Sequence, residues 1–364
     1  MEVGNRSFDL AVIGGGPAGS SAAIVAARSG ARVGLFEAGG FPRQKVCGEF
    51  VSAESLQLLR ELLRDDPYAS DLLRESPVIS ETRLFFGRRV VQTRITPPAL
   101  SIPRRRLDSV LWEAAQRANV CAYGNCEVLS IAGNGPFSLV TAQGTFEAKA
   151  LIVCAGRWSR FSHADLPVGP KWIGVKAHYR ECNPPLSTDL YFFDHGYCGV
   201  QPVSKDVINV CAMVRSDRAN AMQQVFRLSP ELQQRAAKWE LRTPAVSTAP
   251  LLYRQPRAAL ENALLAGDAA GFIDPFAGDG ISMALRTGEA AALCLQAFVK
   301  GEVSLHAAVA EYEAIYQRQF APLIGVAASL RRVLELPHRA RAIAFQALRF
   351  PGVLRYVIRR TRTA

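Results

Sequence analysis

The chain has 364 residues, of which 49% are hydrophobic and 21% charged, so it can bury a large core and is neither disordered nor fibrous. It has no apolar stretch of about 18 residues free of charges, which argues against a transmembrane helix. Its eight cysteines form no C-x-x-C pair and its five histidines no H-x-x-x-H pair, so we expect reduced thiols, a cytoplasmic protein and no metal site.

The N-terminal segment predicts a nucleotide-binding turn. Residues 10–13 form an apolar run typical of a strand, residues 20–29 form an Ala-rich run typical of a helix, and Gly14, Gly16 and Gly19 lie between them. The first glycine permits a tight turn, the second lets the backbone approach a pyrophosphate, and the third lets helix and strand pack closely. The free N–H groups of the helix N-terminus favour phosphate binding. The alternative is a glycine-rich turn without a ligand.

A second strand is predicted at residues 32–36, and it ends at Glu37. A carboxylate at this position can accept hydrogen bonds from both hydroxyls of an adenosine ribose. The same charge disfavours NADP, whose ribose carries a phosphate. The order of strand, glycines, helix, strand and acid therefore predicts a dinucleotide other than NADP.

A second glycine-rich segment, about 250 residues further on, separates FAD from NAD. Residues 263–268 form a buried strand that ends in Asp268, whose carboxylate is placed to bind a ribityl chain. Gly278 and Gly280 then open a long Ala-rich helix, so that its N–H groups point at the ligand. A flavin becomes anionic on reduction, and a helix N-terminus stabilises that charge. The alternative is a surface loop before an ordinary helix.

With these motifs, the chain resembles the geranylgeranyl reductase family. That family belongs to a wider group of flavoproteins that includes aromatic hydroxylases and flavin-dependent halogenases. The likeness rests on both glycine-rich segments and on residues 45–49 and 104–111. It implies that Arg104 contacts FAD from a helix start, and that Cys47 and Gly48 lie near the isoalloxazine ring. The alternatives are a solvated basic cluster at Arg104 and a small buried side chain at Cys47.

Two departures from the wider group bear on function. Ala155 stands where the aromatic hydroxylases carry an Asp that is linked with the nicotinamide donor. We therefore do not expect NADPH or NADH to reduce the flavin directly, and the electron donor is unknown. The Trp-x-Trp-x-Ile-Pro pattern of halogenases is absent, and the aromatic motif of the reductases is altered at residues 196–202. We therefore expect a substrate pocket that differs from the family standard.

The predicted fold is α/β: a Rossmann-like FAD-binding domain of the glutathione-reductase type, interrupted by a β-sheet substrate domain and followed by helices. We assign 1–77, 100–165 and 256–300 to the FAD-binding domain, 78–99 and 166–255 to the β-rich substrate domain, and 301–364 to a helical basic region. The candidate catalytic residues are Cys47 and Tyr197. The candidate FAD contacts are Gly14, Gly16, Pro17, Ala18, Gly19, Glu37, Ala38, Cys47, Gly48, Arg104, Val128, Gly156, Gly267, Asp268, Gly278, Gly280 and Ile281.

The net charge of +11 is concentrated at the C-terminus, where residues 331–364 hold nine arginines and one acid, Glu335, a net charge of +8. Apolar residues recur between these arginines. Such a segment can lie on the anionic inner face of a membrane, or it can pack on the protein as a helical cap. Nucleic-acid binding is not expected, since no reading module accompanies the charge.

Two reactions remain open. In the first, reduced flavin delivers hydride to a carbon–carbon double bond of a lipophilic substrate, and Cys47 or Tyr197 supplies the proton. In the second, reduced FAD reacts with oxygen and hydroxylates an aromatic or polyketide-like substrate through a flavin hydroperoxide. A halogenase and a non-catalytic membrane-associated protein are weaker alternatives. The Cys47 segment and Ala155 favour the first reaction.

Overall fold

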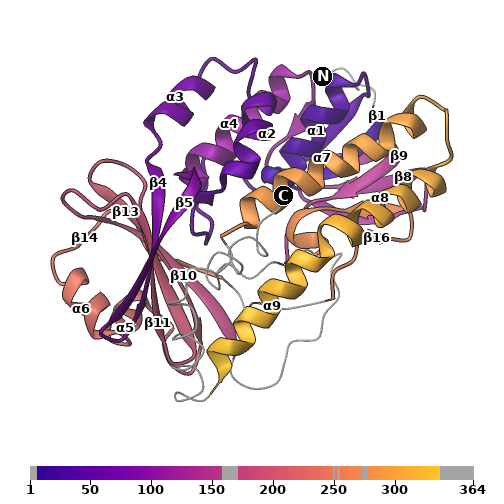
Figure 1. The fold of residues 1–364 in the computed structure, drawn as a ribbon. Helices are drawn as coiled ribbons and strands as arrows, with labels where there is room; N and C mark the ends of the chain where they lie inside the picture. The colour runs from indigo at the N-terminus through magenta and orange to yellow at the C-terminus, as the bar shows by residue number, and fades with distance from the viewer. Residues whose placement is uncertain (1–5, 158–170, 249–250, 252–254, 273–277, 337–364) are drawn as a thin grey trace.

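The computed structural model describes residues 6–157, 171–248, 251, 255–272 and 278–336. Two sheets with their helices lie beside each other in Figure 1. In this part of the chain, no helix is long and apolar enough to cross a membrane.

The first sheet carries the glycine-rich turns. Its main path has the order β16-β17-β9-β1-β2-β6, and all strands after the antiparallel β16 run parallel. These strands are β1 (Ser7–Ile13), β2 (Val33–Phe36), β6 (Cys121–Tyr123), β9 (Gly144–Val153), β16 (Ala259–Leu260) and β17 (Ala263–Leu265). The alternation of hydrophobic positions is lost in β1 and β2, which are buried on both faces, as expected of central parallel strands.

The register of this sheet brings the strand ends together. Ile13 pairs with Phe36 on one side and Val153 on the other, Phe36 pairs with Tyr123, and Val153 pairs with Leu265. The segments that follow these residues therefore leave the sheet at one edge. In open parallel sheets, ligands bind at this carboxyl edge.

Helices cover one face of the first sheet and a β-meander covers the other. The helical layer has α1 (Pro17–Arg28), α2 (Ala53–Leu62), α3 (Ala69–Glu75), α4 (Arg104–Arg117) and α7 (Gly280–Val299). The meander is formed by β7 (Val128–Ala132), β8 (Phe137–Thr141) and β9. Gly288 lets α1 and α7 pack closely, because a Cβ there would lie 2.1 Å from the carbonyl oxygen of Ala18.

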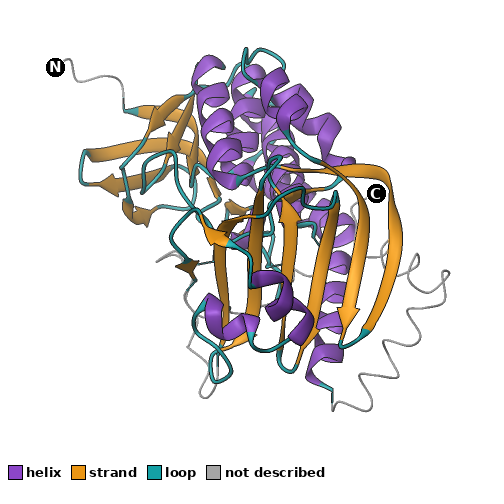
Figure 2. Ribbon diagram, turned by 90° about the vertical axis from the view of Figure 1, so that its left-hand side faces the viewer, coloured by secondary structure: helices purple, strands orange, loops and turns teal. Residues whose placement is uncertain are grey.

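The second sheet has the order β14-β10-β13-β12-β11-β4-β5-β3, with β15 beside β10, and its long strands lie side by side in Figure 2. Its strands are β3 (Phe50–Val51), β4 (Val78–Phe86), β5 (Arg89–Ser101), β10 (Trp172–Arg180), β11 (Ser187–Phe193), β12 (Gly196–Pro202), β13 (Val207–Arg215), β14 (Glu240–Leu241) and β15 (Val246–Ser247).

The two faces of the second sheet have different partners. On one face, Ile208, Val210 and Ala212 pack with residues of two short helices, α5 (Met222–Phe226) and α6 (Pro230–Ala236). The other face, which carries Asn209 and Met213, turns toward the segment that contains Cys47. We call this second face the roof.

The predicted fold class is confirmed, and its differences from the structure are local. Helices α5 and α6 occur inside the segment 166–255, which was expected to be β-rich. Asp268 lies in a short 3-10 turn, η1 (Gly267–Ala269), and not at the end of a strand as expected. The C-terminal region forms α8 (Leu305–Gln319) and α9 (Ala321–Glu335), whereas residues 337–364, with most of the basic charge, lie outside the described residues.

Candidate flavin site

The turn after β1 needs glycine at two positions for reasons of packing. Gly14 has φ +104, and a Cβ there would lie 2.4 Å from the carbonyl oxygen of Cys154. Its N–H donates to the carbonyl of Phe36 at 2.7 Å, which fixes the turn to the neighbouring strand. A Cβ at Gly19 would lie 1.8 Å from the carbonyl oxygen of Gly14. These two glycines hold helix α1 against the sheet.

Gly16 is different, because the space beside it is open. It is the N-cap of α1, with Pro17 in the first turn, and its backbone is extended. Among the described residues, the atoms within 4 Å of a methyl group at Gly16 would be Nη2 of Arg104 and Nη2 of Arg43, both at 3.9 Å. A helix N-terminus facing two guanidinium groups fits the pyrophosphate of a dinucleotide.

Glu37 lies at the end of β2, beside this cradle. Its Oε2 accepts from the N–H of Gly15 at 2.7 Å, its Oε1 accepts from the N–H of Gly39 at 3.0 Å, and it forms an ion pair with Arg43. Burial raises the pKa of this carboxyl, but Arg43 and the two N–H groups outweigh burial and hold it below its usual value. Because a carboxylate offers about four acceptor positions, Glu37 can still accept from ribose hydroxyls.

The remaining predicted contacts at this end lie on three different segments. Ala38 follows it and is exposed, and Ala18 lies in the first turn of α1. Val128 begins β7 two residues after Cys126, whose N–H donates to the carbonyl of Glu37 at 2.8 Å. Sequence reasoning missed Arg43; the signal was a basic residue six positions after the acid of the fingerprint.

Arg104 begins α4, as predicted, and is not a solvated surface residue. Its Nε and Nη2 donate to Asp108 at 2.6 and 2.7 Å. Burial lowers the pKa of Arg104, but the fully buried Asp108 and then the Cys47 thiol raise it above its ordinary value. The guanidinium therefore stays charged between the pyrophosphate cradle and the Cys47 segment.

The early and late segments meet at the other end of the site. A Cβ at Gly278 would lie 3.3 Å from the ring of Phe50. Ser52 Oγ donates to Asp279 at 2.9 Å and lies 2.7 Å from Ser282 Oγ. The start of α7, with Gly280 and Ile281, is thus held beside the segment that contains Cys47 and Gly48, as a bound isoalloxazine ring would require.

Gly267 and Asp268 lie between the pyrophosphate cradle at Gly16 and helix α7. Gly267, at φ +62, donates its N–H to Thr287 Oγ1 at 2.9 Å, and a Cβ there would lie 3.0 Å from the Cβ of Ala18. Asp268 lies 3.4 Å from Nε of Arg157, whose guanidinium is 4.0 Å from the ring centroid of Phe272. Gly156 has φ +73, and among the described residues no atom outside its chain neighbours lies within 4 Å of where its Cβ would be. Arg157 was not identified from the sequence.

The roof carries a buried polar cluster that sequence reasoning also missed. Glu49 is fully buried and contacts Lys176 and His178 of β10. Asn209 of β13 donates to the carbonyl oxygens of Cys47 and Gly48. In β10, Lys176, His178 and Arg180 alternate with apolar or aromatic residues, a pattern typical of a strand with one polar face, so nothing in the sequence signalled that Lys176 and His178 are buried.

The two candidate catalytic residues lie at different places along the roof. Tyr197 pairs with Met213, while Gln201 pairs with Asn209, so Tyr197 and the Cys47 contacts are about 13 Å apart along the strands. Tyr197 is 4% exposed and its ring centroid is 6.0 Å from that of Phe192. The thiol of Cys47 accepts from the N–H of Glu49 at 3.3 Å and lies beside Arg104.

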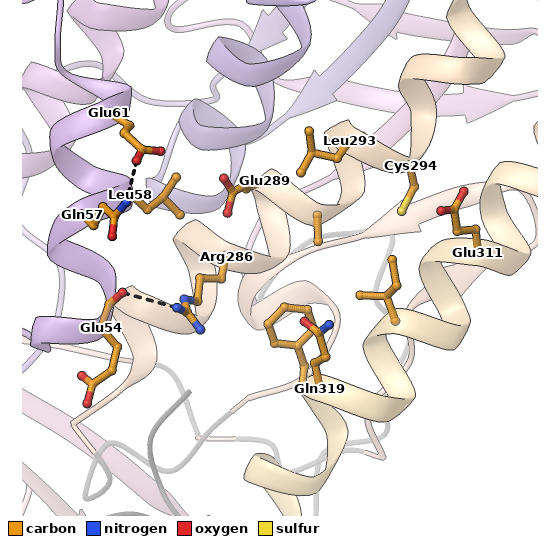
Figure 3. Close-up of a pocket in the computed structure, with 13 residues that line it drawn as sticks. Glu54, Gln57, Leu58, Glu61, Arg286, Glu289, Leu293, Cys294, Glu311 and Gln319 are labelled. Carbon is orange, nitrogen blue, oxygen red and sulfur yellow. Dashed lines mark hydrogen bonds between the residues drawn. The ribbon is translucent and has the colours of Figure 1, made fainter. Parts of the chain in front are cut away.

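A separate hollow of about 510 Å³ lies between α2, α7 and α8 (Figure 3). Its lining includes Glu54, Glu61, Glu289 and Glu311, with Arg286 as the basic residue. Burial and then the charge of Glu61 raise the pKa of Glu289. Four carboxyl groups oppose binding of phosphates, so this hollow does not fit the dinucleotide.

Comparison with known proteins gives one family match and several distant relatives. The pattern of a family described as pyridine nucleotide-disulphide oxidoreductase matches residues 8–183. The menaquinone reductase of Mycolicibacterium smegmatis is 25% identical over 384 residues, which cover 98% of this chain and 91% of the relative. The tryptophan 2-halogenase of Chondromyces crocatus is 24% identical, with 86% of this chain and 66% of that protein covered.

Among solved structures, a triple mutant of the flavin-dependent brominase Bmp2 has the same fold, with a TM-score of 0.78. It is 22% identical, and the superposition covers 96% of this chain and 94% of the brominase. The superposition covers nearly the whole of both chains, so the two proteins share this fold.

Proposed function

We propose that this chain, an FAD-dependent oxidoreductase by its fold and its relatives, reduces carbon–carbon double bonds of a lipophilic substrate. The observation that carries this proposal is the setting of Cys47, a half-buried thiol between Arg104 and the N–H of Glu49. FAD, when bound and reduced, supplies the hydride. The menaquinone reductase that covers nearly the whole chain supports a lipid-soluble substrate.

Cys47 is the proposed proton donor. After its proton has moved to the substrate, the thiolate is stabilised by the Arg104 guanidinium and by the Glu49 N–H. Tyr197 is less suited to this role, because its ring lies in an apolar cluster with Phe192 and Met213. This cluster instead fits the lining of a pocket for an apolar substrate.

The second candidate is a monooxygenase, and the likeness to flavin-dependent halogenases supports it. In that case, the roof would control the access of oxygen and the orientation of an aromatic ring. The two reactions differ in what consumes the electrons of the reduced flavin.

The distinguishing experiment uses the photoreduced holoenzyme without oxygen. We expect polyprenyl lipids or menaquinone to reoxidise the flavin anaerobically, with a saturated product detected by mass spectrometry. A Cys47→Ser variant should bind FAD but slow this step. Reoxidation that requires oxygen and yields a hydroxylated product would instead establish the monooxygenase.

The substrate class and the charge of residues 331–364 suggest how the enzyme reaches its substrate. We propose that the basic C-terminal region attracts the protein to the anionic inner face of a membrane in which the substrate is dissolved. The electron donor is proposed to be a protein or another reductant, since Ala155 replaces the acid linked with NADPH or NADH.

A further inference from the structure

The loop that contains Cys47 is held mainly by side chains of the roof. Residues 42–49 belong to no helix or strand. Asn209 donates through Nδ2 to the carbonyl oxygen of Cys47 at 3.0 Å and to that of Gly48 at 2.9 Å. Lys176 donates to the carbonyl oxygen of Lys45 at 3.2 Å. Three carbonyls of a segment without regular structure are thus bound by two strands of the other sheet.

The loop ends in a buried ion cluster. Glu49 and Lys176 form an ion pair, and His178 Nε2 lies 2.8 Å from Oε2 of Glu49. The N–H of Arg104 donates to Oε1 of Glu49 at 2.8 Å. All three residues are at most 6% exposed. Glu49 also has φ +61, a strained backbone for a residue other than glycine, which persists only where its surroundings hold it.

The orientation of the Asn209 amide follows from its contacts. A flipped amide would place Oδ1 against two carbonyl oxygens, so the Nδ2 assignment is fixed by the loop. Oδ1 itself is buried and has no hydrogen-bond partner among the described residues. The side chain therefore leaves one acceptor unsatisfied while it binds the loop, which indicates that its role is to hold Cys47 and Gly48.

We propose that Asn209, Lys176 and His178 are positioning residues: they fix the Cys47–Gly48 segment against the flavin, so that the substrate sheet sets the orientation of the thiol. They do not touch the reacting atoms themselves. This inference requires that FAD binds at the described site, and it holds for either reaction. If the enzyme proves not to reduce double bonds, the positioning role of these residues is therefore not contradicted.

The test compares Asn209→Ala with Gln201→Ala in the FAD-bound protein. The two residues pair directly across β12 and β13, and both are buried amides, but Gln201 donates to Ser101 Oγ and not to the loop. We measure the rate of Cys47 alkylation by iodoacetamide, identified by peptide mass spectrometry, and the flavin absorption spectrum. Loss of two ordinary hydrogen bonds corresponds to a rise in loop opening of roughly 30-fold.

We expect Asn209→Ala to accelerate Cys47 alkylation and to shift the flavin spectrum, while Gln201→Ala leaves both unchanged. Equal effects of the two variants, or no effect of Asn209→Ala, would overturn the proposal. Lys176→Met should act in the same direction as Asn209→Ala.

A measurement on the unaltered protein covers the case in which the variants do not fold. Hydrogen exchange of residues 45–49 and of β13 should slow together when FAD binds, because the loop and the strand are held as one unit. Protection of the loop without any change in β13 would show that the roof does not position it.

Discussion

Gly14 and Gly16 lie two residues apart, yet the structure assigns them separate roles that alanine substitutions can distinguish. At Gly14, an L-residue would be strained by φ +104, at a cost of about 1–3 kcal/mol. Its Cβ would also overlap the Cys154 carbonyl at 2.4 Å, and overpacking of this kind costs about 1–3 kcal/mol more. We therefore expect Gly14→Ala to destabilise the apoprotein by about 2–6 kcal/mol.

Gly16→Ala should leave the fold intact and weaken the cofactor site. The backbone of Gly16 suits any residue, and the nearest atoms to a new methyl group are 3.9 Å away, so stability should change by less than about 0.5 kcal/mol. The methyl group, however, enters the space between Arg43 and Arg104. Loss of one charged hydrogen bond to a phosphate, about 1.5–3 kcal/mol, corresponds to roughly 10- to 150-fold weaker FAD binding.

The assay combines urea unfolding of the apoproteins with FAD titration followed by flavin fluorescence. Gly14→Ala should lower the unfolding midpoint, and Gly16→Ala should change only the dissociation constant. The reasoning is refuted if Gly16→Ala destabilises the apoprotein as much as Gly14→Ala, or if it binds FAD as tightly as the original chain does.

Four further predictions follow from the site and the charge distribution. Asp268→Ala should weaken FAD retention by about 1–3 kcal/mol, measured by equilibrium dialysis, whereas unchanged retention would restrict Asp268 to pairing with Arg157. Hydrogen bonding to His178 and the charge of Lys176 outweigh burial and hold the pKa of Glu49 below 4.5, so its stabilisation is present above pH 4.5 and is lost as pH falls through the lower folded pKa. Glu49→Gln should therefore flatten the fall in the urea midpoint that the original chain shows as pH drops below 4.5, and an unchanged slope would contradict this assignment. NADPH or NADH alone should reduce the flavin slowly in stopped-flow absorbance, and rapid bleaching by either nucleotide would disprove this. A chain ending at Leu336 should lose the binding to anionic vesicles that the full chain shows in cosedimentation. Binding of the full chain should weaken as salt rises, because the Debye length is only about 8 Å at physiological ionic strength. Equal binding to anionic and neutral vesicles would contradict the proposed attraction to an anionic membrane.

The sequence alone determined the cofactor domain, because its signals are local. The turn at Gly14–Gly19, the acid at Glu37 and the helix that begins at Gly280 each depend on a few neighbouring residues whose backbone requirements are visible in the chain. The assignment of 78–99 and 166–255 as β-rich likewise agrees with most of the strands of the second sheet. These features remained valid in the structure because local preference and tertiary contacts agree.

Only the tertiary structure decided what surrounds the cofactor. Arg43 joins the phosphate cradle through a loop with no regular pattern. Lys176 reaches Lys45, and Asn209 reaches Cys47, from strands more than 120 residues away in sequence. Such contacts depend on how two sheets are oriented relative to each other, and no short-range pattern encodes that orientation. The separation of Tyr197 from Cys47 has the same origin, since the register of β12 against β13 determines where along the roof each side chain lies.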